Sequence, residues 1–327
     1  MDTTINKKAK KVASMGQKRK RDMIFYWSIA ILPIIQVLIF YFGINIKSIL
    51  LSFQEFQNDG ISYGYFFKTS DIFGNIRQAA LDLINEDRIS GALGNSLISY
   101  CTSLLITLPL ALIFSYYVMK KMPMSKFFRV ILFMPSIICA VVLTYIYSLA
   151  VNNLIPDIIQ KFSDPETFNK ADFQLLSKIE TRFWTILVYQ VLTSFSTNVL
   201  MYSSAMSAVS SEMLESARID GVTDFGELIK IVIPTIFPTI TTFLVVGVAN
   251  IFINQMFLVD FYGGQASPQT WTIGYYMYFK TVLQADKVAQ MADYPYLAAM
   301  GLVFTLIIAP ITMLVKYLLE KFGPSED

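Results

Sequence analysis

Uncharged polar side chains recur at helical spacing within two otherwise apolar stretches of the chain. They are Gln190, Ser194 and Asn198 in the first stretch, and Asn250, Asn254 and Gln255 in the second. Residues four apart lie on the same face of a helix. Amide and hydroxyl groups on such a face can hydrogen-bond the hydroxyls of a neutral solute along a path, or they can join neighbouring helices. The spacing alone leaves both interpretations open.

The elements that hold these residues are expected to be membrane helices. Of the 327 residues, 54% are hydrophobic and 15% are charged. Six windows contain no Asp, Glu, Lys or Arg: 23–46, 89–119, 130–156, 183–211, 231–259 and 294–315. Each is long enough to provide the ~20 residues with which an apolar helix crosses the hydrocarbon core of a bilayer. We predict an all-α polytopic membrane protein with six transmembrane helices.

The composition excludes several kinds of catalytic chemistry. The chain has no histidine, which removes His-based acid–base catalysis, the Ser-His-Asp arrangement and His metal ligands. Cys101 and Cys139 both lie inside charge-free windows, where small apolar packing residues are expected rather than a disulfide or a metal pair. The sequence lacks the phosphate-binding P-loop pattern. We expect no catalytic residue, metal or cofactor in this chain, so a partner would have to bind any ATP.

The distribution of basic residues predicts the orientation. Eight Lys and Arg residues precede the first window, and four more lie in the short segment 119–130. A basic run can bind nucleic acid or anionic lipid, but beside a first membrane helix it is typical of the cytoplasmic anchor. We expect both termini in the cytoplasm and no nucleic-acid partner. The predicted parts are a basic terminus at 1–22, a membrane domain at 23–320, external segments at about 53–88, 152–182 and 259–292, and a tail at 321–327.

The last external segment contains an uncharged stretch, residues 261–279, that is not expected to span. Its Gly263-Gly264 and Ser267-Pro268 pairs would leave polar backbone groups in lipid. We expect a loop with a short helix on the membrane surface. Its aromatic residues suit the membrane interface; they are Trp271, Tyr275, Tyr276 and Tyr278.

The segment 210–234 is acidic, although it lies on the side where lysines are expected to gather. Ser211 can cap a short helix that ends near Ile219, Gly221 can adopt the left-handed conformation that stops it, and Thr223 can cap a second helix. Pro234 then marks the start of the fifth membrane helix. The apolar residues of this segment are too numerous for a solvated loop, so some must pack against the bundle or against a partner.

The same segment resembles the EAA loop of permease subunits of ATP-binding-cassette (ABC) importers. The matching residues are Glu215-Ser216-Ala217, Asp220-Gly221 and Ile233-Pro234, with Ser216 and Ile233 as departures from the usual Ala and Leu. Asn95-Ser96, Phe133-Met134-Pro135 and Gly263-Gly264 are similar to the carbohydrate-uptake branch, although Gln265 stands where Pro is usual. The Gly-Gly pair and the long segment after the first window resemble the first of the two permeases in such systems.

The resemblance implies a type I ABC importer fold and a non-catalytic subunit in a bacterial cytoplasmic membrane. Its implied partners are a second, homologous permease, a cytoplasmic ATPase dimer that binds ATP and Mg, and an external solute-binding protein. The ATPase-coupling residues would be Met213, Leu214, Glu215, Ser216, Ala217, Asp220, Gly221 and Pro234. The solute would be a neutral sugar or oligosaccharide, since the windows hold no charge. An ion-coupled carrier or a membrane scaffold is the alternative.

Overall fold

The computed structural model describes residues 22–58, 63–68, 71–162, 169–284 and 286–324, and these form mainly helices. Four of the described helices are long and apolar enough to cross a membrane: Asp22–Leu51, Asp87–Met119, Ala140–Phe162 and Lys287–Phe322. A fifth crossing is possible if the pair Asp224–Thr235 and Phe237–Asn250, bent by 70°, is counted as one span. These helices account for five of the six charge-free windows.

The remaining window, 183–211, forms most of α9 (Ile179–Met206), which is 28 residues long. A helix of this length exceeds what is needed to cross the hydrocarbon core. Its many Ser and Thr residues, together with Gln190 and Asn198, make it more polar than the four helices above. Length therefore supports a membrane helix here, although hydropathy does not select it.

Two windows differ from a single straight helix. The third is interrupted between α6 (Ser125–Ile137) and α7 (Ala140–Leu149), where Ile138 and Cys139 are extended, with ψ of 139° and 135°. The fifth bends at Ile236, between α12 (Ile233–Thr235) and α13 (Phe237–Asn250). Prolines lie at the start of both α12 and α13, where the missing N–H group costs least. Pro234 is the second residue of α12, which continues the helix Asp224–Thr235. The long part of the fifth membrane helix therefore begins after the bend, at Phe237, and not at Pro234 as the sequence predicts.

The first predicted external segment contains the described strands. Strands β1 (Gln54–Asn58) and β2 (Tyr63–Phe67) pair antiparallel, with Phe56 opposite Tyr65, and α3 (Gly74–Asn85) follows. The chain is mainly helical, so the all-α prediction is confirmed, and this two-stranded hairpin is a short addition that the sequence did not predict. The aromatic residues of β2, Tyr63, Tyr65, Phe66 and Phe67, are of the types that favour strands.

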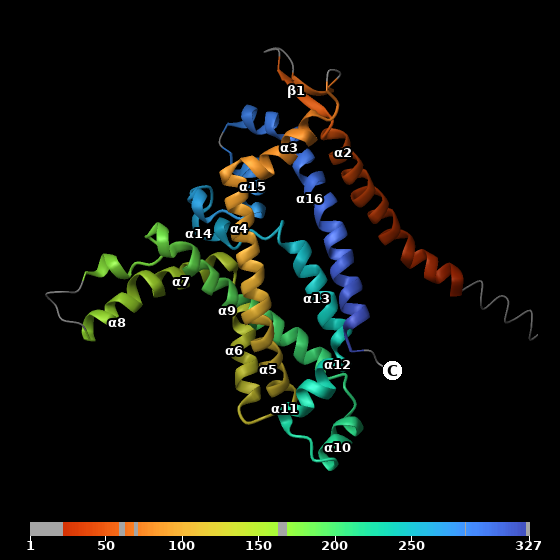
Figure 1. The fold of residues 1–327 in the computed structure, drawn as a ribbon, viewed down its shortest axis with the longest axis vertical. Helices are drawn as coiled ribbons and strands as arrows, with labels where there is room; N and C mark the ends of the chain where they lie inside the picture. The colour runs from red at the N-terminus through yellow and green to blue at the C-terminus, as the bar shows by residue number, and fades with distance from the viewer. Residues whose placement is uncertain (1–21, 59–62, 69–70, 163–168, 285, 325–327) are drawn as a thin grey trace, which may run out of the picture.

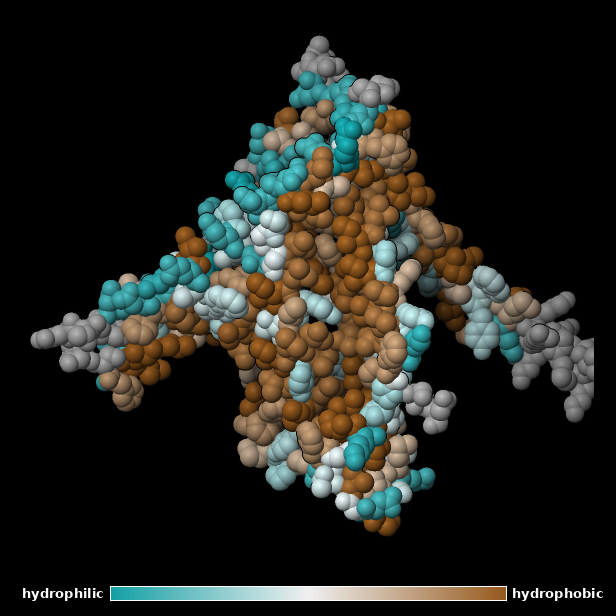
Figure 2. All heavy atoms as spheres, viewed as in Figure 1, coloured by the Kyte–Doolittle hydropathy of each residue, from teal (hydrophilic) through white to brown (hydrophobic). Residues whose placement is uncertain are grey.

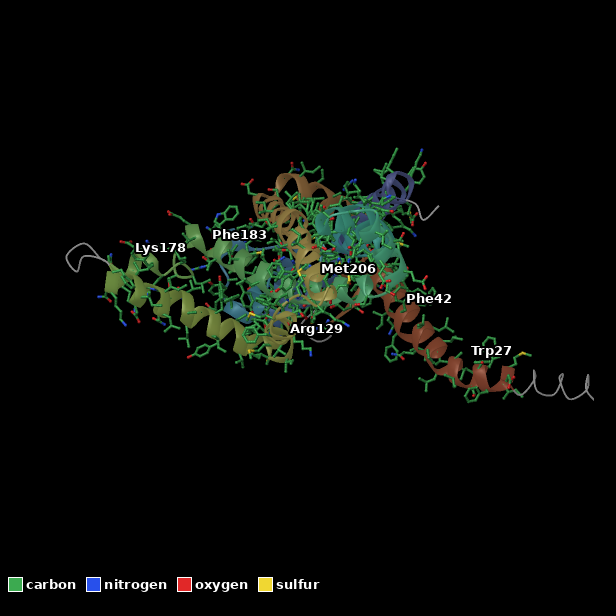
Figure 3. The ribbon with its side chains drawn as sticks, turned by 90° about the horizontal axis from the view of Figure 1, so that it is seen from below. Trp27, Phe42, Arg129, Lys178, Phe183 and Met206 are labelled. Atoms are coloured by element: carbon green, nitrogen blue, oxygen red, sulfur yellow. The ribbon has the colours of Figure 1, made fainter. Side chains whose placement is uncertain are left out.

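Two groups of buried residues form the core. One lies where α4 (Asp87–Thr102) and the start of α9 meet α15 (Ile273–Tyr278) and α16 (Lys287–Phe322). The other lies between α5 (Leu108–Met119), the end of α9 and the π-helical turn Leu228–Val232. Met206, which is 0% exposed, belongs to the second group and lies centrally in the view from below (Figure 3). The long helix α9 therefore connects both parts of the core.

Both ends of the molecule carry polar surface, and further polar surface follows the flank and arm on the left of the view (Figure 2). Hairpin β1–β2 and α3 lie at one end, and α10 (Ser211–Ile219) lies at the other (Figure 1). Between them, the face shown in Figure 2 is dominated by hydrophobic residues. The segments predicted to lie outside at 53–88 and inside at 210–234 are thus at opposite ends of an apolar body.

The first helix packs little against the rest of the described chain. None of the residues in the apolar window of Asp22–Leu51 is buried. Figure 3 shows it extending away from the body, with Trp27 and Phe42 along it. Trp27 is 59% exposed and Phe42 is 52% exposed. An apolar surface of this kind must be covered by lipid or by another protein.

The stretch 261–279 forms only short helices, so the prediction that it does not span is confirmed. They are the end of α14 (Leu258–Tyr262), a 3-10 turn at Pro268–Thr270 and α15. The prediction of interfacial aromatics is wrong for Trp271, Tyr275 and Tyr276, which are at most 7% exposed, whereas Tyr278 is half-buried. Asn95 Nδ2 donates to the carbonyl of Trp271 at 2.9 Å, which helps to hold this stretch inside the protein.

Both cysteines are free, and both are exposed at the protein surface. The expectation that they do not form a disulfide is therefore confirmed for Cys101 and Cys139. Their exposure means that neither packs in the interior of this chain. Cys101 lies on the outward face of α4, and Cys139 lies in the extended break before α7.

Candidate functional site

A cavity of about 480 Å³ lies between α4, α9 and α13. Five of the six predicted path residues line it: Gln190, Ser194, Asn198, Asn250 and Asn254. They lie on the faces that the fourfold spacing predicts. Gln255 is not among the lining residues, although it adjoins Asn254 in the turn after α13. The polar faces of two helices far apart in the sequence therefore meet at one cavity.

The third wall of the cavity was not among the predicted residues. It comes from Ser96, Ser99, Tyr100 and Ser103, which lie on one face of α4 and of the π-helical turn Ser103–Thr107. Their spacing of three and four is the same signal that marks the other two faces. Serine is a weaker indicator than Asn or Gln, because a serine inside a helix often bonds to its own backbone.

Hydrogen bonds across this cavity join α4 and α9 to the turn that follows α13. The Ser99 hydroxyl donates to Oε1 of Gln190 at 2.9 Å, and Nδ2 of Asn254 donates to Oγ of Ser99 at 3.3 Å. Within the described residues, no side-chain hydrogen bond joins Ser194, Asn198 or Asn250 to another group. The side chains of Gln190 and Asn254 thus form hydrogen bonds within the protein, which is the second of the two roles that the spacing left open. The other three side chains keep their polar groups available to the cavity.

Asn254 is held in place by the turn that follows α13. Its Oδ1 accepts from the backbone N–H of Met256 at 2.9 Å, and its carbonyl accepts from the Thr272 hydroxyl at 2.7 Å. Met256 and the next residue, Phe257, have positive φ angles of 51° and 56°, which non-glycine residues seldom adopt. The helix α13 therefore ends beside the cavity, and these hydrogen bonds stabilise the non-helical turn that follows it.

Gly274 permits the close packing of this turn against α15. A Cβ atom on Gly274 would lie 2.3 Å from the carbonyl oxygen of Ile253 and 2.7 Å from that of Asn254. Both neighbours are backbone atoms, which cannot move aside as a flexible side chain can. Glycine is thus required at position 274 to bring α15 against the turn that carries Asn254.

At the other end of the molecule, the acidic segment forms the predicted helix, glycine turn and second helix. The first helix is α10, but its cap is Ser210 rather than Ser211: Oγ of Ser210 accepts from the Met213 N–H at 3.3 Å. Gly221 has φ of 78°, the left-handed conformation expected of it. Thr223 caps α11 (Asp224–Glu227), accepting from the Gly226 N–H at 3.2 Å, as the sequence predicts.

The predicted coupling residues divide between two faces. Met213, Glu215, Ser216, Asp220 and Gly221 are exposed. By contrast, Leu214 packs against the second core cluster, Ala217 is only 7% exposed, and Pro234 is half-buried in α12. Of the three apolar residues Met213, Leu214 and Ala217, α10 therefore exposes only Met213 to a possible partner.

Two exposed apolar side chains lie outside the predicted coupling residues: Ile219 is the last residue of α10, and Phe225 lies in α11. Ile219 is 87% exposed and Phe225 is 69% exposed. Large apolar side chains exposed at a polar end of a protein are candidates for contact with a partner. Together with Met213, they supply an apolar surface that sequence reasoning assigned to Leu214 and Ala217.

The acidic charge of this segment is balanced in part by the basic segment 119–130. Nζ of Lys120 lies 2.7 Å from Oε2 of Glu227 and 3.1 Å from Oδ1 of Asp224. Nε of Arg218 lies 3.7 Å from the same Glu227 oxygen. Burial of the Lys120 ammonium would lower its pKa, but hydrogen bonds to Glu227, Tyr116 and Asp224 outweigh burial and raise it. Lys120 therefore stays charged.

Comparison with known proteins assigns the family. The family model for the binding-protein-dependent transport system inner membrane component matches residues 88–325. The chain belongs to this family. The match includes the cavity helices and the acidic segment, and it begins at the start of α4, after the first helix and the β1–β2 hairpin.

This inner membrane component is similar to several transport proteins. Probable ABC transporter permease proteins of Mycoplasma genitalium and Mycoplasma pneumoniae are 26% and 28% identical, over 54% and 55% of each chain. The matching part thus spans about half the length of these curated relatives. The multiple sugar-binding transport system permease protein MsmF of Streptococcus mutans is 21% identical over 90% of this chain and 95% of its own.

The inner membrane component also shares its fold with a solved structure. The match is to a bacterial ABC transporter involved in the import of the acidic polysaccharide alginate. It has a TM-score of 0.71 and 17% sequence identity, and it covers 94% of this chain and 99% of the other. At this identity the likeness shows the fold alone, and it confirms the predicted type I ABC importer fold.

Proposed function

We propose that this chain is the membrane-spanning permease subunit of an ATP-driven importer for a neutral, hydroxyl-rich solute. The observation that carries the proposal is the cavity between α4, α9 and α13, whose lining residues are all uncharged. Ser194, Asn198 and Asn250 offer amide and hydroxyl groups there, and Tyr100 and Tyr202 add aromatic surface. Such a combination of polar and aromatic groups suits a ligand with many hydroxyls and apolar ring faces.

The proposed solute is a sugar or oligosaccharide. The names of two relatives support this choice: MsmF belongs to a multiple sugar-binding transport system, and AmyD of Thermoanaerobacterium thermosulfurigenes to a probable transport system for starch degradation products. AmyD is 23% identical over 62% of this chain. An acidic polysaccharide such as alginate would need a counter-charge in the membrane. The cavity offers none among its lining residues, so a neutral saccharide fits better.

Energy for import comes from a separate ATPase dimer that binds ATP and Mg, while this chain binds neither. The contact surface is formed by the exposed residues of segment 210–227, with Met213, Ile219 and Phe225 as apolar contacts and Glu215 as a partner for a basic group. A second, homologous permease covers the open side of the cavity. An external solute-binding protein docks at the end formed by the hairpin and α3.

The proposed location is a bacterial cytoplasmic membrane with both termini inside. The end with α10 then faces the cytoplasm, together with the basic segment 119–130, in agreement with the positive-inside rule. The predicted boundaries at 1–22, 23–320 and 321–327 follow from the same orientation. Residues 1–21 and 325–327 lie outside the described part of the chain.

Purification and reconstitution test this proposal. The chain is expressed with candidate partners from neighbouring reading frames and purified in mild detergent, and the complex is placed in lipid vesicles. We expect two permeases and two ATPase copies to purify together. Uptake of a radiolabelled neutral oligosaccharide should require both ATP and the binding protein. Uptake by this chain alone, driven by an ion gradient, would instead favour a secondary carrier.

A further inference from the structure

Lys120 and Glu227 form a buried charge pair between two segments that are far apart in the sequence. Lys120 caps the end of α5, and Glu227 is the last residue of α11. Their side chains are 6% and 1% exposed, and Nζ of Lys120 lies 2.7 Å from Oε2 of Glu227. The ammonium group also lies 5.2 Å from the centre of the Tyr116 ring. The pair is thus enclosed between the end of α5 and the acidic segment.

A buried charge pair contributes little net stability to a protein. Removing two charges from water costs about as much as their attraction returns, and apolar residues of similar volume often serve equally well. Oε1 of Glu227 is buried and has no hydrogen-bond partner within the described residues. The incomplete bonding of Glu227 makes a purely stabilising role a poor explanation. What a buried pair does provide is a defined position for the two segments that it joins.

The pair lies between the segment that carries α10 and the helices that line the cavity. Along the chain, α10 is connected to the cavity through α11, the bent α12 and α13. Lys120 adds a second connection, from α11 directly to α5. Helix α5 packs along α9, which carries Gln190, Ser194 and Asn198, and Oγ of Ser115 on α5 donates to the carbonyl of Val199 at 3.0 Å. A displacement of α11 would therefore reach both walls of the cavity.

We propose that Lys120 and Glu227 are positioning residues that fix the segment 210–227 to the end of α5, so that movement imposed on α10 by the ATPase also moves α5 and α9. The inference rests on the proposed function, because it requires an ATPase that moves α10. Asp224 and Arg218 extend the contact at the surface, at 3.1 Å from Lys120 and 3.7 Å from Glu227. The buried pair is the part that would transmit the movement.

The test compares solute uptake with ATP hydrolysis in the reconstituted complex. Lys120→Met and Glu227→Gln should each raise the ATP hydrolysed per solute transported by about 2- to 30-fold, the range found for residues that modulate coupling between sites. Lys121→Met is the matched control, because the neighbouring Lys121 is exposed and has no ion pair within the described residues. It should keep the wild-type ratio. An unchanged ratio in both Lys120→Met and Glu227→Gln would overturn the proposal.

A reversible cross-link separates positioning from stability. The variant Lys120→Cys with Glu227→Cys is made in a background with Cys101→Ala and Cys139→Ala, so both partners of the pair are removed together and no unpaired buried charge remains. Before treatment, this variant should hydrolyse more ATP per solute transported than the wild type. A short bis-methanethiosulfonate that joins the two thiols should restore the wild-type ratio of ATP to solute, and reductant should abolish that recovery. Failure of the cross-linked complex to regain coupling would overturn the proposal, even if the single variants do not fold.

Hydrogen exchange distinguishes failure of this inference from failure of the proposed function. In the purified wild-type chain, the amides of residues 223–233 should exchange more slowly than in Lys120→Met, while those of residues 87–107 should be unchanged. This measurement requires neither ATP nor solute. If exchange responds as expected but no vesicle shows ATP-dependent uptake, the proposed function is wrong. If exchange at 223–233 does not change, the pair does not fix the segment and the inference is wrong.

Discussion

The hydroxyl of Ser99 donates to Oε1 of Gln190 at 2.9 Å and joins α4 to α9 at the wall of the cavity. Ser99 is 1% exposed and Gln190 is 6% exposed, so neither group can exchange its partner for bulk water. The same Ser99 oxygen accepts from Nδ2 of Asn254 at 3.3 Å. One hydroxyl on α4 therefore contacts both α9 and the turn after α13 at the wall of the cavity.

Ser99→Ala is expected to lower the free energy of unfolding by ~0.6 kcal/mol and by at most about 1.7 kcal/mol, the range measured for hydrogen bonds between membrane helices. The substitution leaves the Gln190 acceptor and the Asn254 donor unpaired. Denaturant titration in mixed micelles measures the change. Ser194→Ala is the control, since Ser194 lines the same cavity without a hydrogen bond to another described residue. Equal loss of stability in both variants would contradict the assignment.

Gly274→Ala is expected to cost about 1–3 kcal/mol, as other overpacking substitutions do. The new Cβ would lie 2.3 Å from the Ile253 carbonyl oxygen, so the backbone must move. Gly301→Ala is the matched control in the interior of α16, where a Cβ meets nothing within 4 Å. It should stabilise the chain slightly, because alanine is the better helix former. Thermal unfolding of the two variants in one detergent decides between these outcomes.

Asn198→Leu is expected to weaken solute uptake without destabilising the chain. Loss of one hydrogen bond to the solute should raise the apparent KM by about 2- to 10-fold. Asn254→Leu cannot make this distinction, because Asn254 also holds the turn through Met256. Thr197→Leu is a suitable control on the exposed face of α9. An unchanged KM in Asn198→Leu vesicles would remove Asn198 from the solute path.

Gly221→Pro is expected to abolish ATP-driven uptake while the chain still inserts. Proline cannot adopt the φ of 78° observed at this position, and it would lose the N–H that donates to the Arg218 carbonyl at 3.1 Å. Gly221→Asn should retain most uptake, because asparagine tolerates the left-handed conformation. Uptake and membrane insertion are measured separately on the same vesicles. Full uptake by Gly221→Pro would show that the turn between α10 and α11 is not needed for coupling.

The uncharged windows predicted where most of the long helices lie, but the break before α7, inside the window 130–156, was not predictable. Pro135 lies inside α6, and the chain becomes extended only at Ile138 and Cys139. A proline in an apolar run is compatible with either a kink or a break in a membrane helix. The position of α7 depends on distant contacts, such as the Tyr147 hydroxyl donating to the Thr185 carbonyl at 2.8 Å.

The faces that line the cavity were predictable from spacing, while the bonds across it were not. The polar side chains spaced four residues apart, at 190, 194 and 198 and at 250 and 254, mark the two faces without any knowledge of the neighbours. Which amides bond to a helix depends on Ser99, which is 91 residues from Gln190 and 155 from Asn254. The buried aromatic residues around Trp271 were misassigned for a related reason: Trp and Tyr suit both a membrane interface and a core that offers a hydrogen-bond partner.

The acidic segment shows both the reach and the limit of local reasoning. The glycine turn and the Thr223 cap were predictable because glycine is preferred at a left-handed helix end and threonine at a helix N-cap. Ser210 and Ser211 are adjacent and chemically alike, so only the backbone geometry selects Ser210 as the cap. The pairing of Lys120 with Glu227 spans 107 residues, and no local pattern indicates it.

The isolation of the helix Asp22–Leu51 has a practical consequence for following the transport cycle. Because the body of the protein makes so few contacts with its apolar window, the tilt of this helix is governed by the surrounding bilayer or by a neighbouring subunit. A spectroscopic label near Trp27 would then report those surroundings, whereas a label on α10 would report the movement that we propose for that helix. The label on this helix can therefore serve as the reference against which the displacement of a label on α10 is measured.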